Sequence, residues 1–199
     1  MIVWLNGAFG AGKTTAAYEL HRRLEHSFVY DPENAGYFLR ENMPQECCTD
    51  DFQDMVLWRS INYHILKEIH TAYDGTVIVP MTLVEPAYYE EVIQRLLAEG
   101  IPVCHIILYA KRETILKRLK RRSLGGYSKE IFAVKAIDRC LAFFDGPAEG
   151  IRIETDGMPV EQIVEKIGEV CGLSLLPDNR SRIGREADRL KTMIQHIRR

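Results

Sequence analysis

Residues 7–14 read Gly-Ala-Phe-Gly-Ala-Gly-Lys-Thr and match the pattern G-x-x-x-x-G-K-[ST] at every fixed position. The apolar residues 2–5 before this segment predict a strand, and the periodicity of residues 15–24 predicts a helix. Glycines let a backbone turn tightly and aim its N–H groups inward, and the N-terminus of the next helix favours an anion. We therefore interpret the segment as a phosphate-binding loop for a nucleoside triphosphate and not as a glycine turn that matches by chance.

The residues of this loop have separate expected roles. The predicted nucleotide contacts are Gly7, Ala8, Phe9, Gly10, Ala11, Gly12, Lys13, Thr14 and Thr15. Lys13 is expected to reach the outer phosphates and to act in catalysis, and Thr14 is expected to offer its hydroxyl to a metal ion. ATP and Mg²⁺ are accordingly the expected cofactors.

Short apolar runs alternate along the chain with helical patterns. The predicted strands are residues 2–5, 28–30, 76–79, 103–109 and 151–153. Most of these runs are continuous rather than alternating, which is typical of strands buried on both faces. Repeated strand–helix alternation predicts an α/β fold of three layers, with a five-stranded parallel sheet between helices and a P-loop kinase-like architecture. We expect this nucleotide-binding domain to span residues 1–172.

The character of the chain changes after Gly172. Residues 173–199 are expected to form a linker and a basic, amphipathic C-terminal helix. The apolar stripe of this helix consists of Ile183, Ala187, Leu190, Met193, Ile194 and Ile197. Two interpretations stay open: the helix contacts an anionic membrane surface, or it packs on its own domain with the stripe inward and the basic face in solvent.

The formal net charge of −2 conceals two basic segments on an acidic body. Residues 111–122 hold seven basic residues and one acidic residue, and residues 180–199 hold seven basic and two acidic. Because the rest of the chain is acidic and would repel phosphates, we expect no nucleic-acid partner. The chain has five cysteines, an odd number, and none of them has CxxC spacing. It also lacks a secretory signal and an apolar run long enough to cross a membrane. These features predict a cytoplasmic protein. Such a protein would be at most peripheral on the inner face of the membrane.

Two polar residues follow predicted strands at the edge of the sheet where ligands of α/β folds bind. Asp31 comes directly after residues 28–30, and we expect it to contact substrate and to prepare an acceptor hydroxyl. Alternatively, Asp31 only caps the next helix, since aspartate before Pro-Glu is a good helix-start signal. Thr82 follows the third strand, which lacks the aspartate of an ordinary Walker B element. We expect Thr82 to be exposed and to bind substrate, or to be a plain strand-end residue.

Three arginines are candidates for stabilising a transferring phosphoryl group. Arg118 and Arg122 are four residues apart on one helical face, and residues 123–128 contain two glycines suited to a hinge. Arg139 lies beyond this stretch. Arginines beside a mobile flap suit phosphoryl-transfer catalysis, and the alternative is a solvated basic helix face.

The second substrate is expected over the insertion at residues 34–73. Arg40 and Arg59 are the predicted substrate contacts there, because guanidinium forks bind anionic or polyhydroxyl groups. Trp58 and Tyr63 are expected to belong to the core.

Several segments of the chain resemble the ATP-binding tunicamycin-resistance protein family. They are MIVWLNGAFGAGKT at 1–14, ELHRRL at 19–24, VYDPE at 29–33, DDFQ at 50–53, LWR at 57–59, IVPMT at 78–82, IDRC at 137–140 and ADRL at 187–190. The resemblance implies an ATP-binding protein that protects bacteria against tunicamycin, a uridine-containing nucleoside antibiotic with a long acyl chain. It also implies membrane association through a C-terminal amphipathic helix, here Arg182–Ile197. Gly12, Lys13 and Thr14 carry over as nucleotide ligands.

Three functions are compatible with these residues. The leading hypothesis is a small P-loop kinase that phosphorylates a hydroxyl of tunicamycin or a related nucleoside. The second is an ATP-dependent protein that binds and sequesters the drug without turnover. The third is a kinase of a nucleotide or another small metabolite.

Overall fold

The computed structural model describes residues 1–122, 127–146 and 148–197, with the backbone alone for residues 122, 127–133 and 193–197. The strands are β1 (Ile2–Asn6), β2 (Ser27–Val29), β3 (Thr76–Pro80), β4 (Val103–Tyr109) and β5 (Ile151–Glu154). They form one parallel sheet in the order β2-β3-β1-β4-β5, with β1 at its centre. The five-stranded parallel sheet predicted from the apolar runs is therefore confirmed.

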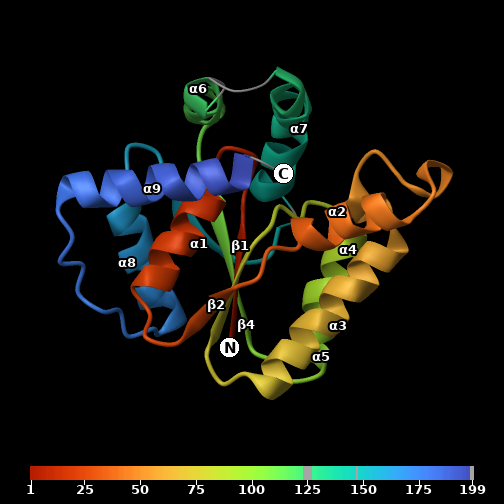
Figure 1. Ribbon diagram of the computed structural model, residues 1–199, viewed down its shortest axis with the longest axis horizontal. Coiled ribbons are helices and arrows are strands. Elements are labelled where there is room, and N and C mark those ends of the chain that lie inside the picture. Colours follow the sequence, from red (N-terminus) through yellow and green to blue (C-terminus); the bar gives the residue numbers. More distant parts are fainter. Residues whose placement is uncertain (123–126, 147, 198–199) are drawn as a thin grey trace.

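Helices cover both faces of this sheet (Figure 1). They are α1 (Lys13–Arg22), α2 (Glu33–Asn42), α3 (Val56–Ala72), α4 (Pro86–Tyr89), a π-helical turn η3 (Glu90–Gln94), α5 (Arg95–Ala98), α6 (Arg112–Arg122), α7 (Tyr127–Asp145), α8 (Val160–Cys171) and α9 (Arg182–Ile197), with short 3-10 turns η1 (Gln45–Cys47) and η2 (Phe52–Asp54). Among the described residues, no helix has the length and apolar character needed to cross a bilayer.

Successive residues of β1 point to opposite faces of the sheet and so belong to different parts of the core. Trp4 packs with residues of α3 and α5, whereas Val3 and Leu5 pack with residues of α1 and α8. Trp58 and Tyr63 are buried in the first of these clusters, as predicted. Burial on both faces explains why the sequence of β1 is continuously apolar.

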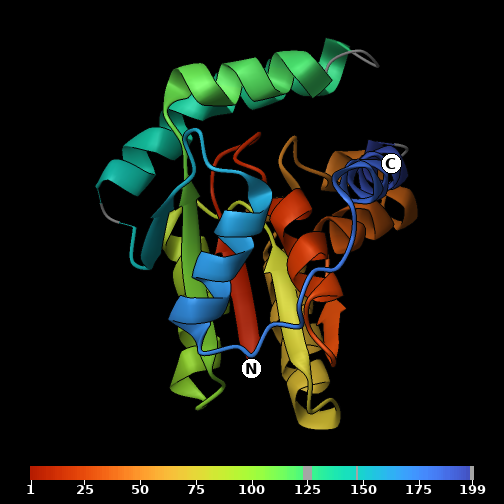
Figure 2. The same cartoon turned by 90° about the vertical axis from the view of Figure 1, so that its left-hand side faces the viewer.

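A third apolar cluster lies at the end of the sheet where the strands terminate. It joins α6 and α7 to β4 and to the start of the glycine loop through residues such as Ala8, Ile107, Ile115 and Ile137. Figures 1 and 2 show both helices above this edge, opposite the end that carries the N-terminus. The packing therefore brings the basic helix α6 next to the glycine loop.

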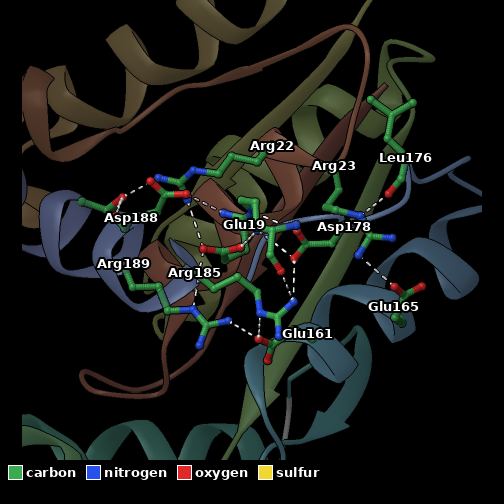
Figure 3. A network of polar contacts seen from close by, with 12 residues as sticks. Glu19, Arg22, Arg23, Glu161, Glu165, Leu176, Asp178, Arg185, Asp188 and Arg189 are labelled. Carbon is green, nitrogen blue, oxygen red and sulfur yellow. Dashed lines mark hydrogen bonds and ion pairs between the residues drawn. The ribbon is translucent and has the colours of Figure 1, made fainter. Parts of the chain in front are cut away.

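The C-terminal helix α9 lies across α1 and is held by charged side chains (Figures 1 and 3). Glu19 of α1, whose side chain is only 4% exposed, accepts hydrogen bonds from Arg180 at 2.6 Å and Arg22 at 3.2 Å. Glu161 of α8 accepts a hydrogen bond from Arg189 at 2.7 Å. Arg180, Arg185 and Arg189 thus point towards the domain, whereas Arg182 is exposed.

The described side chains of the α9 apolar stripe, at Ile183, Ala187 and Leu190, correspondingly point away from the domain. The exposed fractions of Ile183 and Leu190 are 80% and 53%. The helix packs on its own domain, as one of the two interpretations predicts, but within its described side chains the predicted orientation, with an inward stripe and a solvated basic face, is wrong. The physical reason is that α1 and α8 offer the carboxylates of Glu19 and Glu161 to the helix rather than an apolar groove.

Acid is expected to release α9 from the domain. Burial alone would raise the pKa of Glu161, the α8 carboxylate that holds α9, but hydrogen bonds from its own backbone N–H and from Arg189 outweigh burial and lower this pKa. Within the C-terminal segment, hydrogen bonds from Arg180 lower the pKa of Asp178 to about 2 and also lower the pKa of Asp188. A carboxyl group with a lowered pKa stabilises the folded state above its ordinary value, near pH 4, and this stabilisation is lost as the pH falls through the lowered value. We expect the protection of α9 amides, measured against their intrinsic exchange rates at each pH, to fall between about pH 4 and pH 2, and at a higher pH than the protection of β1 amides falls. Loss of protection in both elements at the same pH would contradict this prediction.

Candidate active site

The glycine loop connects the central strand β1 to α1. The backbone φ angles of Gly7, Gly10 and Gly12 are +146°, +84° and +102°, a region that side chains disfavour. A Cβ atom on Gly7 would also lie 2.5 Å from the carbonyl oxygen of Leu108. A Cβ on Gly12 would meet no atom within 4 Å, so only the backbone conformation demands glycine there. The loop has the shape of a phosphate cradle.

The start of α1 adds positive potential to this cradle. Gly12 is the N-cap and offers no side chain, and the first turn of α1 contains no acidic residue. The Lys13 ammonium donates hydrogen bonds to the carbonyl oxygens of Gly7 at 2.9 Å and Ala8 at 3.1 Å, and it lies 5.6 Å from the centre of the Phe9 ring. The N-terminus of α1, the backbone N–H groups of the loop and the Lys13 ammonium can together bind a polyanion.

Two buried polar residues hold the first residue of the loop. The side-chain oxygen Oδ1 of Asn6 accepts hydrogen bonds from the Gly7 N–H at 2.8 Å and the Leu83 N–H at 2.9 Å. The Thr82 hydroxyl donates to the Gly7 carbonyl oxygen at 2.8 Å. Thr82 is only 3% exposed, contrary to the expectation that it faces substrate, because its hydroxyl turns to the loop. Sequence reasoning missed Asn6, although a polar residue at the end of an apolar strand was a usable signal.

Asp31 lies at the carboxyl end of β2, half-buried. Its Oδ1 atom accepts a hydrogen bond from the Glu33 N–H at 3.0 Å, which is the capping role that the sequence left open. The nearby Tyr37 hydroxyl donates to Glu33, and burial together with this carboxylate raises the pKa of Tyr37 to about 12.

Arg139 of α7 lies between two carboxylates, and we call Asp51, Glu85 and Arg139 the acidic rim. Its guanidinium nitrogens are 3.8 Å from an Asp51 oxygen and 3.6 Å from a Glu85 oxygen, and its side chain is 51% exposed. Asp51 caps η2 by accepting from the Gln53 N–H, and burial raises the pKa of Asp51. The rim joins α7 to the insertion and to the loop after β3. Nothing in the sequence pattern singled out Glu85.

Arg118 of α6 links the glycine loop to the segment after β5. Its guanidinium donates to the Ala11 carbonyl oxygen at 3.0 Å and to the Thr155 carbonyl oxygen at 2.7 Å. Burial lowers the pKa of Arg118. The side chain of Arg122 and residues 123–126 of the expected flap lie outside the described residues.

The two arginines of the insertion have partners within the protein. Arg59 is 6% exposed and donates to Glu91 at 2.7 Å and to the Gln53 carbonyl oxygen at 2.6 Å. Arg59 therefore stabilises the fold, contrary to the expectation that it binds substrate. Arg40 is exposed and donates to the Asp50 carbonyl oxygen at 2.5 Å, so it also holds the insertion. The structure brings Lys13, Arg118 and Arg139 to one edge of the sheet. The backbone carbonyl partners of Arg40 and Arg59 lie in the same insertion as Asp51.

Comparison with known proteins identifies related sequences and folds. Residues 2–147 match the model of a family described as AAA domain. The tunicamycin resistance protein of Deinococcus radiodurans is 30% identical, with a TM-score of 0.73 over 88% of this chain and 98% of that one. Among curated proteins, no sequence gives a significant match.

More distant structures share the fold alone. A sugar kinase from Janibacter sp. HTCC2649 is 21% identical, with a TM-score of 0.56 over 87% of this chain and 95% of that one. An APS kinase from Mycobacterium tuberculosis, solved in complex with AMPPNP and APS, is 16% identical, with a TM-score of 0.57 over 86% and 96% of the two chains. The chain thus has a P-loop kinase-like fold.

Proposed function

Because the chain belongs to the AAA domain family, and with the Deinococcus radiodurans tunicamycin resistance protein to one family of P-loop nucleotide-binding proteins, we propose that it transfers phosphate from ATP to a hydroxyl of tunicamycin or a related nucleoside. The observation that carries this proposal is the glycine loop with Lys13 at the start of α1 and Asp31 at the same edge of the sheet. Ligands of open α/β sheets bind at this edge.

Each residue of the site has a role in the proposed transfer. The backbone of residues 7–15 binds the phosphates, and Lys13 turns from its carbonyl partners towards them. Arg118, Arg122 and Arg139 offset the charge that develops on the transferring group. Asp31 orients the acceptor hydroxyl and takes its proton as the new P–O bond forms, while the bond from the γ-phosphorus to the bridging oxygen breaks and ADP leaves.

A magnesium ion fits the donor chemistry at the start of α1. The Thr14 hydroxyl, half-buried in the first turn, is the oxygen ligand that the loop offers, and hard cations prefer oxygen. When bound with ATP, Mg²⁺ supplies neutralisation of phosphate charge. Thr14 is therefore the residue that we propose to hold it.

The charges of the described side chains favour an uncharged acceptor. Lys13 and Arg118 lie at the glycine loop, where ATP would bind. On the acceptor side, Asp31 and the acidic rim contribute three carboxylates against the guanidinium groups of Arg139 and of Arg40, which acts on Asp51. Glu91 occupies the Arg59 guanidinium. A phosphorylated acceptor would be repelled by this excess of carboxylates. This supports a nucleoside or another hydroxyl-rich molecule over a nucleotide, which the third hypothesis would include.

Mass spectrometry of the drug after incubation with ATP tests the proposal. We expect a product heavier by one phosphoryl group, and we expect Asp31→Asn to lower the rate about 10²–10⁴-fold. Asparagine retains an oxygen for the Glu33 N–H, so the cap and the fold should survive. Asp74→Asn, at a 90% exposed side chain, is the matched control. Unmodified drug at stoichiometric protein, with binding retained in the Asp31→Asn variant, would instead favour the sequestering protein.

We also propose that the outward stripe of α9 contacts an anionic membrane surface. The exposure of Ile183 and Leu190, together with the basic Arg182 at 88% side-chain exposure, supports this contact. Ile183→Glu and Leu190→Glu should reduce cosedimentation of the full chain with phosphatidylserine-containing vesicles. Val170→Glu, at a 40% exposed position of α8, should not. Equal cosedimentation of all variants would contradict the proposal.

A further inference from the structure

The carbonyl oxygen of Gly7 is shared by two side-chain donors. The Thr82 hydroxyl donates to it at 2.8 Å from the loop after β3, and the Lys13 ammonium donates to it at 2.9 Å from α1. A carbonyl oxygen has two lone pairs and can accept both bonds. The two donors differ in mobility, because Thr82 is 3% exposed on a short side chain whereas Lys13 has a long, flexible one.

The N–H of the same residue is also held. Asn6, which is fully buried, accepts from the Gly7 N–H and donates to the Leu83 carbonyl oxygen at 2.8 Å. Its Nδ2 atom is also 3.1 Å from Nε2 of His105. Burial lowers the pKa of His105 to about 4, so at neutral pH the uncharged ring can accept there. Asn6 and Thr82 therefore fix both polar backbone groups of the first loop residue.

Binding of ATP takes Lys13 away from this carbonyl. The proposed function requires the ammonium to turn towards the phosphates, and each carbonyl oxygen that it leaves loses a donor. Loss of the last donor of a buried carbonyl costs free energy, which would oppose nucleotide binding. Gly7 avoids this loss because the Thr82 hydroxyl stays in place.

We propose that Thr82 is a positioning residue for nucleotide binding, whose hydroxyl holds the Gly7 carbonyl so that Lys13 can exchange that carbonyl for phosphate. The proposal rests on the nucleotide-binding part of the proposed function and is independent of the acceptor. Thr82 needs no contact with either substrate in this role. It acts through the shape of the loop and through the freedom of Lys13.

Nucleotide affinity in variants of Thr82 tests the exchange. We expect Thr82→Val, which removes the hydroxyl at nearly constant volume, to weaken ATP binding in calorimetry about tenfold, the effect of one hydrogen bond. The unfolding temperature of the nucleotide-free variant should change little, because Lys13 still donates to Gly7. Thr82→Ser should bind ATP within about twofold of the wild type, since it restores the donor. Thr76→Val, at a half-buried threonine at the start of β3, is the matched control.

A double-mutant cycle tests the shared carbonyl without nucleotide. Lys13→Met and Thr82→Val each leave one donor on Gly7, whereas the double variant leaves neither. We expect its loss of unfolding temperature to exceed the sum of the two single losses. Additive losses, or unchanged ATP affinity in Thr82→Val, would overturn the proposal. Failure of the wild type to bind ATP would overturn the proposed function itself and, with it, the exchange.

Discussion

We expect the Lys13→Met variant to transfer phosphate about 10²–10³-fold more slowly than the wild type. Lys13 is the charged side chain at the start of α1, and its ammonium rests on the Gly7 and Ala8 carbonyl oxygens, where the cradle opens. Methionine has a similar length and flexibility but no charge, so it cannot offset charge on the transferring phosphoryl group. The rate of drug phosphorylation at saturating ATP measures the effect.

Two comparisons separate this effect from a damaged fold. Thr82 continues to donate to Gly7 in the Lys13→Met variant, so its unfolding temperature should stay close to that of the wild type. Lys117→Met places the same change on an exposed position of α6 and should retain activity. A Lys13→Met variant with wild-type turnover would contradict the assignment of residues 7–15 to the phosphates.

The largest expected loss of stability comes from Glu19→Gln. The Glu19 carboxylate is 4% exposed and lies within 4 Å of guanidinium nitrogens of Arg22, Arg180 and Arg189. Removal of one partner from a buried ion pair commonly costs 3–5 kcal/mol, and because these arginines keep some exposure and other partners, we expect about 2–3 kcal/mol here. Urea unfolding measures this change.

The same substitution should also free the C-terminal helix. Amides of α9 should exchange faster in the Glu19→Gln variant, whereas those of β1 should lose only the protection that follows from lower global stability. Glu25→Gln, at an exposed residue shortly after α1, provides the control. Unchanged stability and unchanged exchange in α9 would show that Glu19 does not hold the tail.

Local sequence patterns were enough to predict the sheet. Residues 2–5 were predicted as a strand and β1 is Ile2–Asn6, because a central strand must be apolar on both faces. The ends of the sheet fit this rule less well. Phe28 in β2 and Ile151 in β5 are 48% and 43% exposed, since an edge strand has a neighbour on one side alone. Short apolar runs marked these strands without revealing that they were edges.

The site was predictable only where its residues are close in sequence. The glycine loop is one continuous segment, so its shape follows from local chemistry. The prediction that Arg59 and Thr82 bind substrate is wrong because it leaves out their partners within the protein. These partners, Glu91 and Gly7, are 32 and 75 residues away in the sequence. A local sequence pattern does not show which distant carboxylate or carbonyl oxygen will accept a hydrogen bond from a given side chain.

The direction of the tail was not predictable for a related reason. A helix with one apolar and one basic face has the same periodicity whichever face it turns to the domain. The orientation of α9 is determined by Glu19, which lies 161 residues before its partner Arg180, and by Glu161, which accepts a hydrogen bond from Arg189. Neither carboxylate carries a signal of its own in the sequence.

The outward stripe of α9 has a practical consequence for handling the protein. Salt shortens the range of charge attraction from about 10 Å at 0.1 M to about 3 Å at 1 M, which weakens the arginine contacts that hold the helix. Sulfate salts at the same time strengthen the association of apolar surfaces such as Ile183 and Leu190. Ammonium sulfate precipitation should therefore drive molecules together through their tails, and purification in dilute buffer should keep them apart.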